Sequence, residues 1–156
     1  HRLYGLRYSI LRFANVYGPG QSAGGEGGVV AIFVRRLLNG QSPDIYGDGE
    51  QTRDFVFVED VAAANALALR AGHNRIINIG HGSSVSINEL LKQLAAIAGT
   101  PVVPVYRAPR AGDIRHSSLN GTLAHQVLGW KQQYDLRTGL QRTLDAFRRM
   151  ECEYAG

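Results

Sequence analysis

Cysteine, lysine and long apolar runs are all scarce in this sequence. Cys152 is the only cysteine among 156 residues, so disulfide bonds are not expected in the fold and a reducing, cytoplasmic location is expected. No apolar run approaches the roughly 18 residues that a membrane-spanning helix needs, and no signal peptide opens the chain. We therefore expect no membrane partner. Because His1 is not a natural start, we also expect the chain to begin inside a longer protein.

The sequence also lacks the patterns of a metal site, a hydrolase and a nucleic-acid-binding protein. Its separate histidines show neither i,i+4 pairing nor a neighbouring cysteine, so no metal site is predicted at His73, His81, His116 or His125. The formal charge is +4, but the arginines are scattered, without a basic run or interleaved aromatic residues, which argues against nucleic acid. There is no G-x-S-x-G nucleophile motif and no Gly-Lys-Ser/Thr of a Walker loop.

What is present indicates one globular domain. The composition, 44% hydrophobic and 19% charged, is ordinary for such a protein, and 156 residues suffice for a real core. Apolar patterns predict strands at residues 8–16, 45–46, 55–58, 75–79 and 102–106. They predict helices at residues 29–38, 61–71, 87–97, 123–128 and 136–150, with Asp60 as a cap of the second and a Ser86–Glu89 capping box at the third. Strands that alternate with helices indicate an α/β fold.

Two features lie at the end of the first predicted strand. The amide of Asn15 needs a partner if it is buried, either in the neighbouring turn or in a ligand bound beyond the carboxyl end of the strand. The loop Gly18–Gly24 lies between a strand and a helix, as a dinucleotide-binding loop does. Its G-x-G-x-x-x-G spacing and Pro19 argue against that function. The loop is therefore either a connector or a border of the ligand site.

Two arginine motifs carry the strongest functional signal. They are Gln51–Phe55, which contains Arg53, and Pro109–Asp113, which contains Arg110 and ends in a carboxylate. A guanidinium is a planar, permanent cation that suits phosphate oxygens, and a carboxylate can accept hydrogen bonds from sugar hydroxyls. Together the motifs predict a nucleoside-diphosphate ligand. The alternatives are a surface ion pair of Arg53 with Asp54 or Glu50, a solvated Arg110, and a turn at Asp113.

The order of the motifs resembles the C-terminal half of extended short-chain dehydrogenases of the NAD-dependent epimerase/dehydratase family. The motifs, which with the final helix span essentially the whole chain, are Leu11–Pro19, Ile45–Gly49, Gln51–Val58, Asn78–Gly80, Arg110–Asp113 and Leu128–Trp130. They are most similar to nucleotide-sugar epimerases of the UDP-glucose 4-epimerase type. This resemblance implies the C-terminal part of an extended Rossmann-type dehydrogenase, with a small mixed sheet and flanking helices.

The resemblance also implies an activity and a division of labour. Residues 1–156 would be the substrate-binding half of an enzyme that epimerises UDP-glucose, UDP-galactose or N-acetylated forms at C4. The NAD-binding half and the catalytic Tyr-x-x-x-Lys pair would lie upstream, so the chain alone would be inactive. Two alternatives remain within the superfamily, a dTDP-glucose 4,6-dehydratase and a UDP-glucuronate decarboxylase. A non-catalytic sugar-nucleotide binding module is the alternative from another class.

Ten positions match the substrate-binding residues of that family, and five of them would hold the nucleotide. Arg53 and Arg110 would bind the two phosphates. Asp113 would accept hydrogen bonds from the ribose hydroxyls. Ile45 and Tyr46 would border the uracil.

The other five positions would complete the base pocket and the sugar site. Asn15 would contact the sugar diphosphate, and Gly28 and Val29 would offer backbone amides at a helix start. Val85 would line the base pocket. Ser117 stands where some epimerases carry a bulky tyrosine, so its small side chain would leave room for an N-acetyl group.

Two predicted strands would normally belong to a larger sheet. Without the upstream half, strands 8–16 and 75–79 would leave open edges and apolar faces, which favour pairing with another chain. We therefore expect a homo-oligomer.

Overall fold

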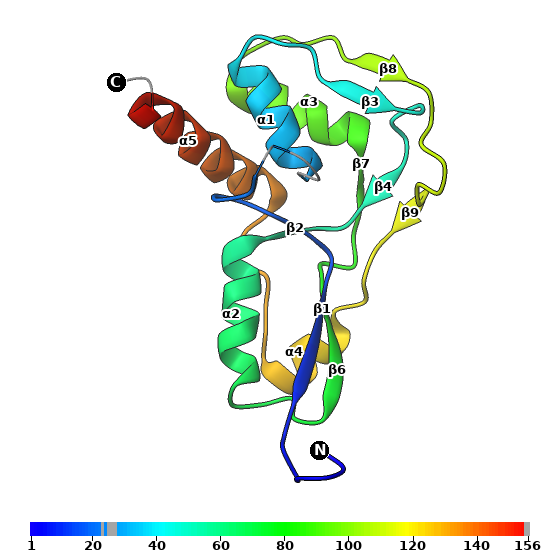
Figure 1. Ribbon diagram of the computed structural model, residues 1–156, viewed down its shortest axis with the longest axis vertical. Coiled ribbons are helices and arrows are strands. Elements are labelled where there is room, and N and C mark those ends of the chain that lie inside the picture. The colour runs from blue at the N-terminus through cyan, green and yellow to red at the C-terminus, as the bar shows by residue number, and fades with distance from the viewer. Residues whose placement is uncertain (23, 25–27, 155–156) are drawn as a thin grey trace.

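The computed structural model describes residues 1–22, 24 and 28–154 (Figure 1). Its helices are α1 (Val29–Leu38), α2 (Val58–Ala68), α3 (Ile87–Ala98), α4 (Thr122–Leu128) and α5 (Leu136–Tyr154). Its first five strands are β1 (Ser9–Phe13), β2 (Asn15–Tyr17), β3 (Asp44–Tyr46), β4 (Thr52–Arg53) and β5 (Phe55–Phe57). The others are β6 (Arg75–Ile79), β7 (Val85–Ser86), β8 (Val105–Arg107) and β9 (His116–Ser117). The α/β class is confirmed.

The predicted strand 8–16 is divided at Ala14, where it changes its partner. β1 pairs in parallel with β6, and β2 pairs in parallel with β5. At the junction the Ala14 amide donates to the Ile79 carbonyl at 2.9 Å and the Asn15 amide donates to the Asp54 carbonyl at 2.8 Å. The strand therefore leads from the β6 side of the molecule to the β5 side without a turn.

The strands form several small sheets in place of one small mixed sheet. Besides the pairs β1–β6 and β2–β5, β3 pairs in parallel with β8. The fourth sheet has the order β7–β4–β9, antiparallel on one side of β4 and parallel on the other. This sheet was not predicted, because strands of two residues carry no readable alternation. The strand predicted at 102–106 begins later, at Val105, after Pro104.

The apolar side chains form two core clusters. In one, α1, α3 and α5 pack around side chains that include Phe33, Leu94 and Leu144. In the other, α2 and α4 cover β6 and bury side chains that include Ile77 and Trp130. Figure 1 shows the first group of helices at one end of the molecule and α2, α4, β1 and β6 at the other. β2 and β5 run between the two groups.

The capping box before α3 is half formed. The Ser86 hydroxyl accepts a hydrogen bond from the Glu89 amide at 3.1 Å, as predicted. The Glu89 carboxylate does not complete the box within the described residues, because it accepts from Gln93 at 3.0 Å and lies near Lys92. α3 ends at Gly99, whose left-handed conformation (φ 70°) a glycine adopts without strain.

Asp60 does not cap α2, so this prediction is wrong. Phe57 is the N-cap, and α2 starts directly after β5. Asp60 lies in the first turn, is 1% exposed and accepts hydrogen bonds from the amides of Gln133 and Tyr134. The carboxylate holds a distant loop against the helix, a role that spacing along the sequence does not reveal. The helix also ends at Ala68, before the predicted residue 71.

The sheet of β1 and β6 carries exposed apolar side chains, although strand 8–16 was predicted to be buried. Ile10 and Ile76 face each other across the pair and are 47% and 56% exposed, and Phe13 is 41% exposed. Within the described residues β1 bonds only to β6, so its other edge is open. No described helix is both long and apolar enough to cross a membrane.

We predict that the chain self-associates through this face, because an open edge beside apolar side chains favours pairing. In analytical ultracentrifugation at tens of micromolar, the sedimentation coefficient is expected to rise with concentration. Ile10→Lys should weaken the association, whereas Val103→Lys, at a position 79% exposed in the segment before β8, should not. A monomer at every concentration would contradict the prediction.

Candidate functional site

A cavity of about 380 Å³ collects most of the predicted site residues. Seven of the ten predicted positions line it, namely Asn15, Val29, Ile45, Tyr46, Arg53, Arg110 and Asp113. They come from the start of β2, the start of α1, β3, β4 and the segment after β8. Residues from widely separated parts of the chain thus face one space.

The β7–β4–β9 sheet sets the position of Arg53. It also contains two of the three predicted residues that do not line the cavity. In the register of the sheet, Arg53 lies between Val85 on β7 and Ser117 on β9. Val85 and Ser117 do not line the cavity, but they flank the strand that carries Arg53. The sheet therefore places three predicted residues side by side, with the arginine at the cavity.

Gly28, the third residue outside the lining, is the N-cap of α1. A side chain here would collide with Gln21, because a Cβ atom would lie 2.3 Å from the Gln21 amide nitrogen. That nitrogen donates to the Val16 carbonyl at 3.1 Å. The absence of a side chain at Gly28 thus allows Gln21 to tie α1 to the end of β2.

The two arginines are already engaged within the chain. Arg53 Nη2 donates to Asp113 Oδ1 at 2.5 Å, and Arg53 Nη1 donates to the Thr52 carbonyl at 2.9 Å. The Arg53 side chain is only 14% exposed. Arg110 stacks on Tyr46, with its guanidinium carbon 3.7 Å from the ring centroid. The ion pair of Arg53 is therefore with Asp113, and neither Asp54 nor Glu50 provides it.

The segment 109–115 is fastened over the turn between β3 and β4. Besides the contacts of Arg110 and Asp113, Arg115 donates to both carboxylate oxygens of Asp48, at 2.6 and 2.9 Å. These bonds lower the pKa of Asp48 to about 2, with a further contribution from the Glu50 amide. Polar contacts thus fix this wall of the cavity against β3 and β4.

Gln51 is the most informative lining residue that the sequence analysis did not single out. It lines the cavity, is 9% exposed, and donates from Nε2 to the Tyr46 carbonyl at 2.9 Å. This bond fixes the backbone of the residue on which Arg110 stacks. A signal was available, because Gln51 opens the motif that contains Arg53. The other lining residues that were not predicted are Phe33, Asp44, Ile87, Ala111 and Gly112.

The loop after β2 does not resemble a phosphate cradle where it is described. Gly18 (φ 148°) packs so tightly that a Cβ atom would lie 2.5 Å from Val58 Cγ1, and α1 begins only at Val29. Residue 23 of the predicted loop and residues 25–27, which follow it, lie outside the described residues. Across the described ranges, no group of three or more histidine, cysteine, aspartate or glutamate side chains is arranged for a metal ion.

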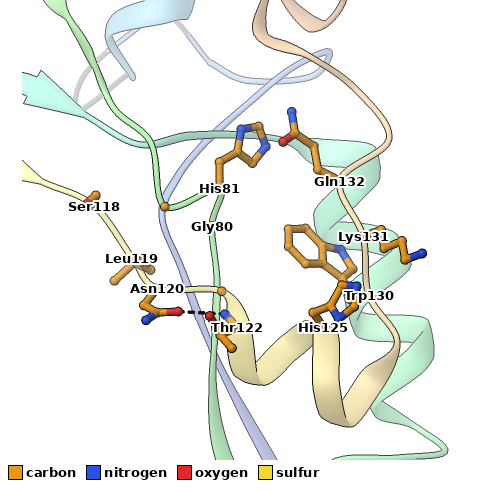
Figure 2. A pocket seen from close by; sticks show the side chains of 12 residues that line it. Gly80, His81, Ser118, Leu119, Asn120, Thr122, His125, Trp130, Lys131 and Gln132 are labelled. Carbon is orange, nitrogen blue, oxygen red and sulfur yellow. Dashed lines mark hydrogen bonds between the residues drawn. The ribbon is translucent and has the colours of Figure 1, made fainter.

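A second cavity, of about 580 Å³, lies away from the predicted residues. It is lined by residues that include Gly80, His81, Asn120, Trp130 and Gln132, and by none of the ten predicted positions. Figure 2 shows the His81 ring and the Gln132 amide directed toward each other, with Lys131 pointing away. Although this cavity is larger, it lacks the pair of cations and the carboxylate that the predicted chemistry requires.

His81 gives a testable dependence of stability on pH. Burial lowers the pKa of the imidazole, against the opposing charges of Asp54 and Asp60. The unfolded chain therefore binds the proton more readily than the folded chain, so stability is full above the ordinary pKa of about 6.5 and falls as the pH drops through it. In urea unfolding, the loss of stability between about pH 7.5 and 5.5 should be smaller for His81→Gln than for the parent chain.

The exposed His125 on α4 provides the control for this measurement. His125→Gln should lose as much stability over this range as the parent chain. An equal loss in His81→Gln and the parent chain would contradict the prediction.

Comparison with known proteins finds similar sequences over most of the chain. The family described as NAD dependent epimerase/dehydratase matches residues 1–80. The UDP-glucose 4-epimerase of Mycolicibacterium smegmatis is 46% identical over 147 residues, which cover 94% of this chain and 47% of the relative. The chain thus spans about half the length of the curated relatives it matches.

Solved structures show the same similarity. The UDP-glucose 4-epimerase of Thermotoga maritima, crystallised with UDP-glucose, is 49% identical, with a TM-score of 0.94 over 96% of this chain and 48% of that one. The UDP-N-acetylglucosamine 4-epimerase of Methanobrevibacter ruminantium, in complex with UDP-N-acetylmuramic acid, is 36% identical, with a TM-score of 0.92 over 96% of this chain and 48% of that one.

Proposed function

Because the chain belongs to the NAD-dependent epimerase/dehydratase family, we propose that it binds a UDP-hexose and orients the sugar for 4-epimerisation. The chain would supply the substrate-binding half of the enzyme. The NAD-binding half and the catalytic tyrosine and lysine would lie in a segment that this sequence does not contain. In this role the chain contributes to catalysis by holding the sugar in a reactive position.

The convergence of Arg53, Arg110 and Asp113 on one cavity with Asn15 is the observation that carries the proposal. Two guanidinium groups match the charge of a pyrophosphate and can form two parallel hydrogen bonds to its oxygens. Asn15 makes no side-chain hydrogen bond within the described part of the chain, so its amide can turn to the ligand. Ile45 and Tyr46 offer an apolar edge and a ring for the base.

Binding would replace two contacts of the free chain. The pyrophosphate would take the place of Asp113 beside Arg53 and leave that carboxylate for the ribose hydroxyls. It would also draw Arg110 from the Tyr46 ring. Tyr46 would then be open to the base. The first step exchanges one ion pair for another, and the second exchanges a cation–π contact for an ion pair, so neither leaves a cation unpaired.

We propose that this chain provides only a small part of the NAD site. In the described part of the loop after β2, Gly18 packs directly against the Val58 side chain. This contact leaves no space there for a pyrophosphate. The sequence has no Tyr-x-x-x-Lys pair, and its only lysines are Lys92 and Lys131. We therefore propose that NAD is held mainly outside this chain and that the chain alone is inactive.

We also propose a cytoplasmic location, because Cys152 is the single cysteine of the sequence.

Calorimetry with UDP, dTDP and GDP tests the binding role directly. The folded chain is expected to bind UDP more tightly than dTDP or GDP, and circular dichroism in the same samples verifies the fold. If the folded chain binds none of the three nucleotides, the proposal is wrong.

A chimera tests the enzymatic role. This chain replaces the matching half of the Mycolicibacterium smegmatis relative, and the product from UDP-glucose is identified with NAD present. UDP-galactose is the expected product. A 4-keto-6-deoxy product would indicate a dehydratase, and absence of turnover beside an active parental enzyme would favour a non-catalytic binding module.

Ser117 predicts the range of sugars. Its side chain is small and lies beside Arg53 in the sheet, so the chimera should accept both UDP-glucose and UDP-N-acetylglucosamine. Ser117→Tyr should lower kcat/KM for the N-acetylated sugar by roughly tenfold or more while it preserves turnover of UDP-glucose, because overpacking a site costs about 1–3 kcal/mol. Ser118→Tyr, at the exposed neighbouring position, is the control. Turnover of UDP-glucose alone by the unmodified chimera would contradict the prediction.

A further inference from the structure

Asp54 is a buried carboxylate between β4 and β5. It is 1% exposed and accepts three backbone hydrogen bonds, from His81 to Oδ1 at 3.1 Å and from Gly82 and Leu119 to Oδ2 at 3.1 and 3.2 Å. No cation pairs with it within the described ranges. The carboxylate is therefore satisfied by backbone amides that converge from two distant segments.

The backbone of Asp54 binds two further segments. Its amide donates to the Ser117 carbonyl at 3.0 Å, and its carbonyl accepts from the Asn15 amide at 2.8 Å. Arg53 precedes it in the chain. One residue thus contacts the start of β2, the end of β9, the loop after β6 and Leu119, and it adjoins the arginine that reaches into the cavity.

The surroundings of the carboxylate are built for it. A Cβ atom at Gly80 would lie 2.6 Å from Asp54 Oδ2 and 3.0 Å from Leu119 Cβ. The glycine therefore leaves the space that the carboxylate fills. Figure 2 shows the chain at Gly80 and His81 beside the segment Ser118–Asn120, which form one wall of the second cavity. Asp54 ties these two segments together from the side of β4.

We infer that Asp54 is a positioning residue of the substrate cavity. Its carboxylate clamps the loop at residues 81–82 and the chain at Leu119, which holds β9 beside β4 and thereby sets the direction in which Arg53 leaves the sheet. The inference rests on the proposed function, because it assigns Asp54 a role in the binding of the nucleotide. It extends that function to a residue that does not line the cavity.

The charge of Asp54 is needed because three donors meet two oxygens. An asparagine has the same size but only one oxygen, and its amide group would direct hydrogens at one of the three amides. Asp54→Asn therefore breaks the clamp without changing the packed volume. Gly80→Ala attacks the same clamp from the other side, because the added methyl group would displace the carboxylate.

Asp60 offers a matched control. It is also 1% exposed and also accepts backbone hydrogen bonds, from Gln133 at 2.9 Å and Tyr134 at 3.3 Å, but it lies on α2 away from the substrate cavity. Asp54→Asn and Asp60→Asn each remove one buried charge that is bound by amides. A general loss of stability would affect UDP binding equally in the two variants.

The test is calorimetry with UDP on both variants, well below their melting temperatures. Asp54→Asn is expected to weaken UDP binding roughly tenfold and Asp60→Asn less than about twofold. In the Arg53→Ala background, Asp54→Asn should add less than about twofold, because the two residues act through one contact. Equal effects of Asp54→Asn and Asp60→Asn, or full additivity with Arg53→Ala, would overturn the inference.

Amide hydrogen exchange separates this inference from the proposed function. In Asp54→Asn, exchange should accelerate at the amides of residues 15 and 54, which bond across β2, β5 and β9. In Asp60→Asn, it should not. If the parent chain does not bind UDP, the proposed function fails, and exchange still decides whether Asp54 positions these strands. Unchanged exchange at both amides would refute the clamp.

Discussion

Replacing Arg53 by alanine is expected to weaken UDP binding by roughly 10- to 150-fold, because a charge-assisted hydrogen bond contributes about 1.5–3 kcal/mol. The guanidinium is only 14% exposed and is held by the Thr52 carbonyl and Asp113. The bond to the Thr52 carbonyl, which binding need not break, keeps the guanidinium oriented and reduces the entropy that the ligand must remove. Calorimetry with UDP measures the loss. The UDP affinity of Arg53→Lys should lie between that of Arg53→Ala and that of the parent chain, because an ammonium group keeps the charge but lacks the planar guanidinium.

Arg142 on α5 is the matched control for Arg53. It pairs with Glu59 at 3.0 Å and stacks on Tyr134, away from the cavity. Arg142→Ala removes the same positive charge from the chain and should leave UDP affinity unchanged within about twofold. If Arg53→Ala and Arg142→Ala bind UDP with the same affinity as the parent chain, the phosphate assignment fails.

Replacing Phe57 by alanine is expected to lower the free energy of unfolding by roughly 3–5 kcal/mol, the range for buried aromatic residues. Phe57 is fully buried, its ring lies 5.6 Å from that of Tyr17 and 4.9 Å from that of Tyr134, and it ends β5 at the start of α2. Loss of the ring would leave a cavity between β5 and α5. Urea unfolding followed by circular dichroism measures the change.

Leu69 supplies the control for this substitution. It follows α2 and is 82% exposed, so Leu69→Ala should change stability by less than about 0.5 kcal/mol. A loss below about 1 kcal/mol in Phe57→Ala would show that the core refills the space, and the expected importance of this ring would then be wrong.

Local patterns predicted the elements that local interactions stabilise. The helix at residues 87–97 has a repeating apolar stripe, a serine cap and a glycine stop, and α3 matches it closely. The strand at 75–79 matches β6. Asp60 was misjudged because its partners, Gln133 and Tyr134, lie more than seventy positions away in the chain. A carboxylate before an apolar stripe gives the same local pattern whether it caps the helix or binds a distant loop.

The chemical groups of the site could be read from the sequence: two guanidinium groups, a carboxylate and an amide, in motifs of one enzyme family. Their meeting in one cavity is a property of the fold. Arg53 and Asp113, 60 positions apart, touch because two-residue strands pair β4 with β9. Burial and hydrogen bonds to distant amides, among them the three amides that donate to Asp54, stabilise this pairing. These interactions form only when the chain is folded, so local sequence patterns do not reveal them.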